Sequence, residues 1–393
     1  TPERVLAFLR ELAAKARPVA QRELDELRAF AAKDLGLHDL QPWDVGWASE
    51  KLRVARYAFE EEQLKPYFAL PGVLKGVLDI ATDVFGVRFR ERDDVATWHP
   101  DVQYFDVLDA DGSVRAGVYF DHYAREGKRG GAWMDVCRTR LGLTGQIPVA
   151  YLTCNAAPPV EGRPSLLTHD DVITLFHEFG HGLHHLLTEI GWPAVSGING
   201  VEWDAVELPS QFMENFGWKR EALDRFARNC QIGEPLPEDL FAKMTAARHF
   251  HAGLFLVRQL EFALYDFRLH LEYDPAKGPR TLELLDEVRA EVSVITPPAW
   301  HRFPHAFTHI FAGGYAAGYY SYLWAEVLSA DAFGAFEEAA VAAGSVFDAA
   351  TGARYRREIL AVGGSRPALE SFIAFRGREP DPMALLRSYG LAA

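Results

Sequence analysis

The sequence has little cysteine and no long apolar run. Its cysteines, Cys137, Cys154 and Cys230, are three scattered residues among 393, and an odd, dispersed set of this kind excludes both a disulfide framework and a Cys-x-x-Cys metal site. No apolar stretch approaches the ~18 to 20 residues that a membrane-spanning helix needs. We therefore expect a cytoplasmic protein that has no membrane partner.

Basic clusters, repeats and low-complexity tracts are also missing. The net charge is -14 at pH 7, which argues against nucleic acid or an anionic membrane as a binding partner. At 49% hydrophobic residues over 393 positions, the chain is long enough and apolar enough to bury a large core. These properties are typical of a globular protein.

The most informative segment is His177-Glu178-Phe179-Gly180-His181. On a helix, residues i and i+4 project about 40° apart, so both imidazoles can reach one zinc ion while Glu178 stands beside it. Catalytic zinc uses two histidines, a third ligand and a water in this way. The pattern therefore indicates a zinc metallopeptidase, although a chance match in a core helix is the alternative.

The residues around this motif favour a helix. Thr168 can serve as the N-cap, and Asp171 adds acidic charge to the first turn, where it interacts well with the helix dipole. The apolar residues keep a helical period through the motif; they are Val172, Leu175, Phe176, Phe179, Leu183, Leu186 and Leu187.

A third zinc ligand must come from elsewhere in the chain. One zincin pattern continues with glycine and histidine at the positions that His184 and Leu187 occupy here, so that pattern is excluded. The alternative is a carboxylate from a later helix, and the candidates are Glu202, Glu207 and Glu214. Because Glu207 and Glu214 are seven residues apart, they would share a helix face, one as a ligand and one as support.

The secondary structure is expected to be mainly α with a small β-sheet, in one catalytic region covering residues 1–393. We expect helices over 1–97, a small sheet over about 103–154, and helices over 168–393. Within the helical regions, one helix is expected to end near Lys15 and the next to begin near Pro18, and a long amphipathic helix is expected from about Pro237 to Glu272. The clearest β signal is a hairpin, in which Gln103–Leu108 and Ala116–Asp121 alternate around Asp111-Gly112.

A second group of candidate residues is aromatic. Tyr315, Tyr319 and Tyr322 follow an i, i+4, i+7 spacing, which would place them on one face of a helix. His309 precedes them, and Gly313-Gly314 permits an irregular entry to the helix. A tyrosine hydroxyl could stabilise an oxyanion, whereas the alternative is an aromatic core stripe.

Together, these motifs resemble the thimet-oligopeptidase family of zinc peptidases. The resemblance rests on ordered motifs along nearly the whole chain, which are Tyr123–Asp135, Val149–Asn155, Phe176–His181, Val206–Asn215, Phe303–Tyr322 and Arg376–Pro380. It implies a zincin-type catalytic domain with the H-E-x-x-H motif on a core helix.

The resemblance also implies a role for each candidate residue. One Zn2+ per chain would be held by His177, His181 and Glu207, with Glu178 as the general base. Tyr322, or as the second candidate Tyr315, would stabilise the oxyanion, while His309 and Tyr319 would position the substrate. The strand around Tyr151 would hold an extended peptide by its edge.

The expected activity is hydrolysis of internal peptide bonds in short oligopeptides. The alternative is a dipeptidyl carboxypeptidase of the same fold, which needs a cation for the substrate's C-terminal carboxylate; Arg125, Lys128 and Arg129 are candidates. Family members also carry an N-terminal helical segment ahead of the matched region, which is absent here. We therefore also consider a poorly active fragment that needs its N-terminal half, or self-association through the uncovered cleft face.

Overall fold

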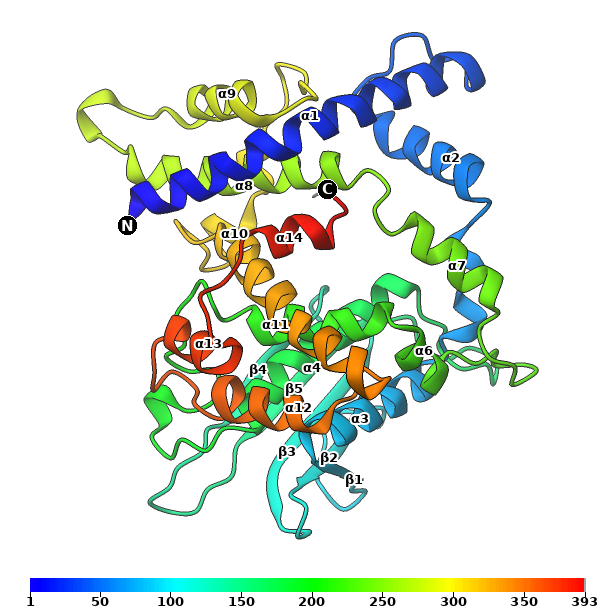
Figure 1. Ribbon diagram of the computed structural model, residues 1–393, viewed down its shortest axis with the longest axis vertical. Helices are drawn as coiled ribbons and strands as arrows, with labels where there is room; N and C mark the ends of the chain where they lie inside the picture. Colours follow the sequence, from blue (N-terminus) through cyan, green and yellow to red (C-terminus); the bar gives the residue numbers. More distant parts are fainter. Residues whose placement is uncertain (392–393) are drawn as a thin grey trace. The chain divides into compact units, whose positions relative to one another are not determined.

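The computed structural model describes residues 1–391, which form two compact units (Figure 1). Unit 1 combines Thr1–Phe59 and Lys243–Trp324 with the C-terminal segment from Pro382, and unit 2 combines Glu60–Ala242 with Ala325–Asp381. The sequence predicted one region because the segments of each unit alternate along the chain, so no linker marks the boundary between them.

Unit 1 is helical, and its two long helices α1 and α8 run side by side (Figure 1). Its helices are α1 (Pro2–Asp34), α2 (Val45–Tyr57), α8 (Ala252–Leu271), α9 (Thr281–Val292), α10 (Thr308–Phe311) and α14 (Met383–Ser388), with 3-10 turns at Pro275–Lys277 and Phe303–Ala306.

The helix α1 continues through Pro18, where the sequence predicted a break between two helices. Proline removes one helical hydrogen bond and costs about 3 kcal/mol in a helix interior. Packing against α8 offsets this cost, because Gly253 allows the α8 backbone to approach Ala20 closely. The carboxylate of Glu23 also accepts hydrogen bonds from the backbone N–H groups of Gly253 and Leu254, at 3.2 and 2.8 Å.

The long helix expected from Pro237 to Glu272 is interrupted. It forms α7 (Glu238–Ala247) and α8, and His251 between them has a φ of 56°. The apolar periodicity continues across this point, so the pattern alone did not reveal the break at 248–251, where the left-handed His251 precedes α8.

Unit 2 contains a five-stranded sheet in the order β1-β2-β3-β5-β4. The strands are β1 (Arg88–Glu91), β2 (Gln103–Leu108), β3 (Val114–Tyr123), β4 (Trp133–Arg138) and β5 (Val149–Ala156). The pairs β1/β2, β2/β3 and β4/β5 are antiparallel, and β3/β5 is parallel.

The sheet confirms the predicted hairpin and corrects the region before it. Gly112 turns the β2/β3 hairpin with a φ of 88°, a conformation that glycine adopts without a steric penalty. The expectation of helix throughout residues 1–97 is wrong at β1. This strand is four residues long and pairs with β2, and so short an edge strand carries little periodicity.

Two helices of unit 2 pack on the sheet: α4 contacts β3, β4 and β5, and α3 contacts β1. Phe179 on α4 contacts Phe120 and Phe89, with ring centroids 6.2 and 5.8 Å apart. The helices are α3 (Leu70–Phe85), α4 (His169–Leu186), α5 (Leu208–Glu214), α6 (Arg220–Phe226), α12 (Ala349–Tyr355), the π-helix Arg356–Leu360 and α13 (Ala368–Arg376), with 3-10 turns at Glu61–Gln63, Lys65–Tyr67, Pro193–Val195 and Asn215–Trp218. The helix α11 (Ser321–Ala343) begins in unit 1 and continues into unit 2. The predicted class, mainly α with a small sheet, is confirmed.

Candidate active site

The helix α4 carries the His-Glu-x-x-His motif and begins where the sequence predicted. The Thr168 hydroxyl accepts a hydrogen bond from the Asp171 backbone N–H at 3.0 Å, and the Asp171 carboxylate accepts one from the Thr168 N–H at 2.9 Å. This reciprocal pair satisfies two backbone donors at the helix start. Apolar residues then bury one side of the helix in the core of unit 2.

Gly180 brings α4 and α5 close together. A Cβ atom at this position would overlap the Pro209 carbonyl oxygen and lie 2.6 Å from Ser210 Cα, so no larger residue fits without moving one helix. The close approach places Glu207, the residue before α5, opposite the two histidines of the motif.

Two histidines converge on one buried carboxylate. The Nε2 atoms of His177 and His181 lie 3.3 and 3.1 Å from Oε2 of Glu207, and the Glu207 side chain is 4% exposed. Ligand atoms of the three residues all lie within 4.8 Å of one another, and this is the one such cluster among the described residues.

Glu214 fixes the orientation of His177. Its Oε1 lies 2.7 Å from Nδ1 of His177, so Nδ1 donates to Glu214 and Nε2 directs its lone pair toward Glu207. A lone pair would then face a carboxylate oxygen, which is unfavourable unless a cation lies between them. The donor set of two imidazoles and one carboxylate is one that catalytic zinc uses, so the residues present fit a divalent metal.

The pKa values of the cluster also indicate that positive charge stabilises it. Burial disfavours ionisation of Glu207, but its interactions with His177 and His181 outweigh burial and hold its pKa well below the usual value. Burial likewise disfavours charge on His177, but Glu207 and Glu214 outweigh it and raise the pKa of His177 well above the usual value. A cation between these atoms, whether a proton or a metal ion, therefore stabilises the cluster.

Glu178 lies beside the cluster but outside it. It is 6% exposed, and burial raises its pKa, with Glu207 adding to the increase, while His177, His181 and the backbone N–H of Met134 act in the opposite direction. Met134 belongs to β4, so the predicted base lies next to the edge strand of the sheet. This contact could not be predicted from the sequence, because β4 has no clear alternation that would mark it as a strand.

The two other candidate carboxylates have different environments. Glu214 contacts His177 as described, which is the supporting position that its spacing from Glu207 allowed. Glu202 accepts a hydrogen bond from the backbone N–H of Ala368 at 3.1 Å, and it is outside the cluster of ligand atoms.

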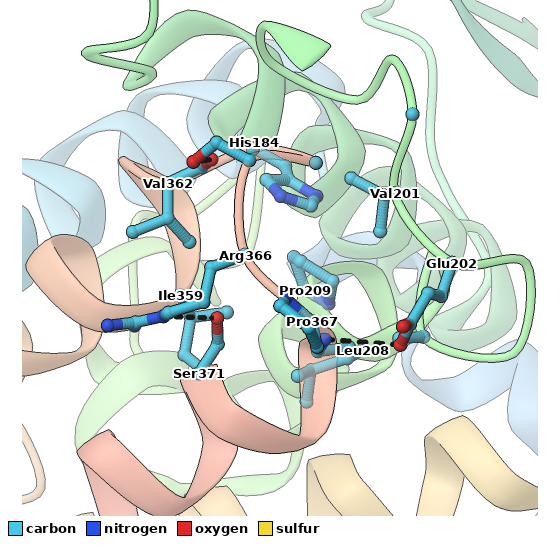
Figure 2. A pocket seen from close by; sticks show the side chains of 16 residues that line it. His184, Val201, Glu202, Leu208, Pro209, Ile359, Val362, Arg366, Pro367 and Ser371 are labelled. Carbon is cyan, nitrogen blue, oxygen red and sulfur yellow. Dashed lines mark hydrogen bonds between the residues drawn. The ribbon is translucent and has the colours of Figure 1, made fainter.

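A cavity of about 200 Å³ lies further along α4 (Figure 2). His184 and Glu202 line it, together with Leu208, Pro209 and the Gly363-Gly364 loop. His184 is 3% exposed and its Nδ1 has no hydrogen-bond partner in the part of the chain described. Burial, followed by the nearby histidines, lowers the pKa of His184 to about 3. His184 is thus a buried neutral histidine.

The sheet edge differs from the prediction. The strand around Tyr151 is β5, which is paired on both sides, by β3 and β4. The expectation that it offers a free edge is therefore wrong, and β4 forms this edge of the sheet. The ring of Tyr151 lies in an aromatic cluster, with centroids 5.3 Å from Trp98 and 5.4 Å from Tyr119. Its hydrogen bond with Cys137, followed by burial, raises the pKa of Tyr151 to about 12.

The tyrosine group belongs to unit 1. Tyr322 lies in the first turn of α11, but Tyr315 and Tyr319 precede that helix, so the prediction that all three share one helix face is wrong. Their rings nevertheless lie close together: the ring centroids of Tyr315 and Tyr319 are 5.0 and 5.2 Å from the ring centroid of Tyr322. His309 lies 6.0 Å from Tyr315, 5.4 Å from Tyr319 and 6.3 Å from Tyr322.

The described residues include no helix with the length and apolar character to cross a membrane.

The chain is similar to known peptidases along almost its whole length. The model of peptidase family M3 matches residues 1–391. The chain is 52% identical to oligopeptidase A of Salmonella typhimurium over 99% of its own length and 57% of the relative's. It is 46% identical to an organellar oligopeptidase A of Arabidopsis thaliana, covering 100% of this chain and 51% of that protein.

A more distant relative and one solved structure extend the comparison. A dipeptidyl carboxypeptidase of Salmonella typhimurium is 38% identical, over 98% of this chain and 57% of that protein. The structure of a putative oligoendopeptidase F shares the fold, with a TM-score of 0.54 at 17% identity over 98% of this chain and 56% of the other. The chain thus spans 51% to 57% of the length of these relatives. With a family model matched from residue 1 to residue 391, the chain belongs to peptidase family M3.

Proposed function

We propose that this chain carries the catalytic centre of a zinc-dependent oligopeptidase that cleaves internal bonds of short peptides. The observation that carries the proposal is the convergence of His177 and His181 on the buried Glu207, with Glu178 beside them. The similarity to oligopeptidase A supports the substrate class. The scattered cysteines favour the reducing cytoplasm as its location.

The proposed metal site holds one Zn2+ per chain. His177, His181 and Glu207 would bind it, and Glu214 would keep the His177 ring in the orientation that directs Nε2 inward. When bound, zinc supplies a Lewis acid that polarises the scissile carbonyl and lowers the pKa of a water molecule to about 7.

Glu178 is the proposed general base. Its carboxylate takes the proton from the attacking water and then delivers it to the leaving amine. A buried carboxyl with a raised pKa suits both steps, because it accepts a proton more readily than an exposed glutamate and can still release it.

The substrate backbone is proposed to lie along β4. An edge strand binds an extended peptide through main-chain hydrogen bonds and is therefore tolerant of side-chain sequence. The hydrogen bond that Glu178 accepts from the Met134 N–H supports this proposal, because Met134 belongs to β4. Tyr151 remains a candidate for a substrate contact through its side chain.

The tyrosine group is proposed to act on the reacting carbonyl. Tyr322, and after it Tyr315, would donate a hydrogen bond to the oxyanion that forms on the substrate. His309 and Tyr319 would position the peptide. The gathering of these four rings in unit 1 supports a shared role.

Replacement of Glu178 by glutamine tests the proposal. Glu178→Gln should keep one zinc per chain and its thermal stability while losing nearly all turnover of a quenched fluorescent peptide, because an amide does not accept the proton. Glu202→Gln is a matched control that lies outside the ligand cluster. Substantial turnover by Glu178→Gln would contradict the assignment of the base.

A dipeptidyl carboxypeptidase is the second candidate, and the 38% identical relative supports it. This activity needs a cation that recognises the substrate's C-terminus. Arg125 and Lys128 already pair with Asp121, at 2.6 and 2.9 Å, whereas Arg129 lies over the Trp133 ring at 5.7 Å. Mass analysis of the products separates internal cuts from stepwise release of dipeptides.

The relatives are longer than this chain, and we consider two roles for the part that is not matched. In the first, the chain alone is poorly active and needs an N-terminal half for full activity. In the second, the chain self-associates through the cleft face that such a half would cover. Turnover measured for the chain alone and after adding the N-terminal portion of a relative, together with its mass in solution, distinguishes these cases.

A further inference from the structure

A buried carboxylate in unit 1 holds the segment that carries the tyrosines. Asp266 on α8 is 0% exposed. Its Oδ1 accepts a hydrogen bond from the Ala317 backbone N–H at 2.8 Å, and its Oδ2 accepts one from the Tyr319 N–H at 2.9 Å. The Gly318 N–H also donates to it, so three consecutive backbone donors surround one carboxylate.

The backbone at this point depends on such an anchor. Ala317 has a φ of 56°, a left-handed conformation that is unfavourable for an L-residue with a Cβ atom. Successive N–H groups in a turn of this kind form a concave site for an anion. The Asp266 carboxylate occupies that site, and Nδ1 of His270, one turn along α8, lies 3.0 Å from its Oδ1.

The anchored segment leads directly into the tyrosine group. The Tyr319 hydroxyl donates to Oε1 of Gln259, also on α8, at 3.0 Å. The Tyr319 ring lies 5.2 Å from the Tyr322 ring, and Tyr322 in turn stacks on Tyr315 at 5.0 Å. The helix α8 therefore holds both the backbone of this segment and one of its hydroxyls.

We propose that Asp266 is a positioning residue for the peptidase reaction: its carboxylate fixes residues 315–322 in the single conformation that presents the tyrosine hydroxyls. This inference rests on the proposed function of Tyr322 and Tyr315. Asp266 itself touches neither substrate nor metal in this account. It acts through the backbone of the segment, so its loss should affect the rate of reaction rather than the binding of substrate.

Asp266→Asn is the first test, because it keeps the shape of the side chain while turning an amide NH2 toward backbone donors. We expect kcat for peptide cleavage to fall by about 10- to 100-fold, since a misplacement of about 1 Å can cost that much. We expect KM to change by less than about 3-fold and zinc content to stay at one per chain.

Glu261→Gln is the matched control. Glu261 is also on α8 and 1% exposed, and its carboxylate pairs with Arg258 and Arg289, at 2.8 and 3.0 Å. Its replacement should lower thermal stability to a similar extent while kcat stays within about 3-fold of the unmodified chain. An equal loss of kcat in both variants would mean that Asp266 has a structural role alone and would overturn the proposal.

A double-mutant cycle tests whether Asp266 acts through the tyrosine. If it does, Asp266→Asn should lower kcat far less in the Tyr322→Phe background than in the unmodified chain, because coupled residues are not additive. Additive losses would overturn the proposal. If Asp266→Asn does not fold, the same cycle is measured with His270→Gln, which removes one partner of the carboxylate at a half-buried position and should give a smaller, equally non-additive loss.

Amide hydrogen exchange separates this inference from the proposed function. The backbone amides of residues 317–319 should exchange faster in Asp266→Asn than in the unmodified chain or in Glu261→Gln, whether or not the chain cleaves peptide. Unchanged exchange would overturn the proposed anchor. If the unmodified chain with added zinc does not cleave peptide, the proposed function fails, and with it the role of Asp266 in catalysis. Faster exchange in Asp266→Asn would in that case still support the proposed anchor.

Discussion

Replacing Gly180 by alanine should weaken metal binding even though alanine is the better helix former. The substitution stabilises an ordinary helix position by about 1 kcal/mol. Here the new Cβ would lie 2.6 Å from Ser210 Cα, where ordinary contact needs roughly 3.5 to 4.0 Å. The two helices would have to separate by about 1 Å, and Glu207 would move away from the histidines with α5.

The expected size of the effect follows from these opposing contributions. Overpacking a core typically costs about 1–3 kcal/mol, from which the gain in helix propensity is subtracted. Gly180→Ala should therefore be destabilised by up to about 2 kcal/mol in the metal-free state and should bind zinc more weakly as well. Thermal unfolding in the presence of a chelator measures the first effect, and competition with a chromophoric chelator measures the second.

Gly182→Ala is the control on the same helix. A Cβ at Gly182 would meet Leu152 side-chain atoms at 3.3 Å, and a flexible leucine can move by a few tenths of an ångström. This variant should retain its zinc affinity and be close to neutral in stability. If Gly180→Ala proves as stable as the unmodified chain and binds zinc equally well, the close approach of α4 and α5 does not position Glu207.

Three further outcomes are expected. Glu214→Gln should lower zinc affinity by about 10- to 100-fold, since it weakens the hydrogen bond that orients His177; an unchanged affinity in a chelator competition would contradict this role. Tyr322→Phe should lower kcat by about 100- to 1,000-fold with little change in KM, and an unaltered kcat would move the oxyanion role to Tyr315. Burial, followed by Lys128, lowers the pKa of His122 from 6.5 to about 4 in the folded state. As the pH falls, the unfolded chain therefore takes up a proton at this histidine first, and the unmodified chain should lose up to about 3 kcal/mol of stability between pH 6.5 and pH 4. Denaturant unfolding of His122→Leu should show a weaker dependence over that range, and an identical dependence would exclude His122 as its source.

Most of the cluster of His177, His181 and Glu207 could be predicted from the sequence because its geometry is local. His177, Glu178 and His181 lie within two turns of one helix, and the capping pair at Thr168 fixed where that helix begins. The spacing of the sequence limited the third candidate ligand to Glu202, Glu207 or Glu214 but did not choose among these three carboxylates. The contact between α4 and α5 at Gly180 is tertiary, and no periodicity encodes it.

Other features depend on long-range pairing and were missed for that reason. The strand β4 was not predicted, and the edge was assigned to the strand around Tyr151, because strand order is set by partners distant in the chain. The i, i+4, i+7 spacing of the tyrosines suggested a helix face, but Asp266, about fifty residues away, holds that segment in a left-handed turn before α11 begins. Pro18 was interpreted as a helix boundary, whereas packing against α8 carries α1 through it.

The zinc content of Glu207→Ala tests the proposed metal site, and it is measured by elemental analysis after dialysis beside the unmodified chain and Glu202→Ala. We expect one zinc per chain for the unmodified protein and for Glu202→Ala, with little or none for Glu207→Ala. Full zinc content in Glu207→Ala, with loss of zinc in Glu202→Ala, would contradict the proposed site.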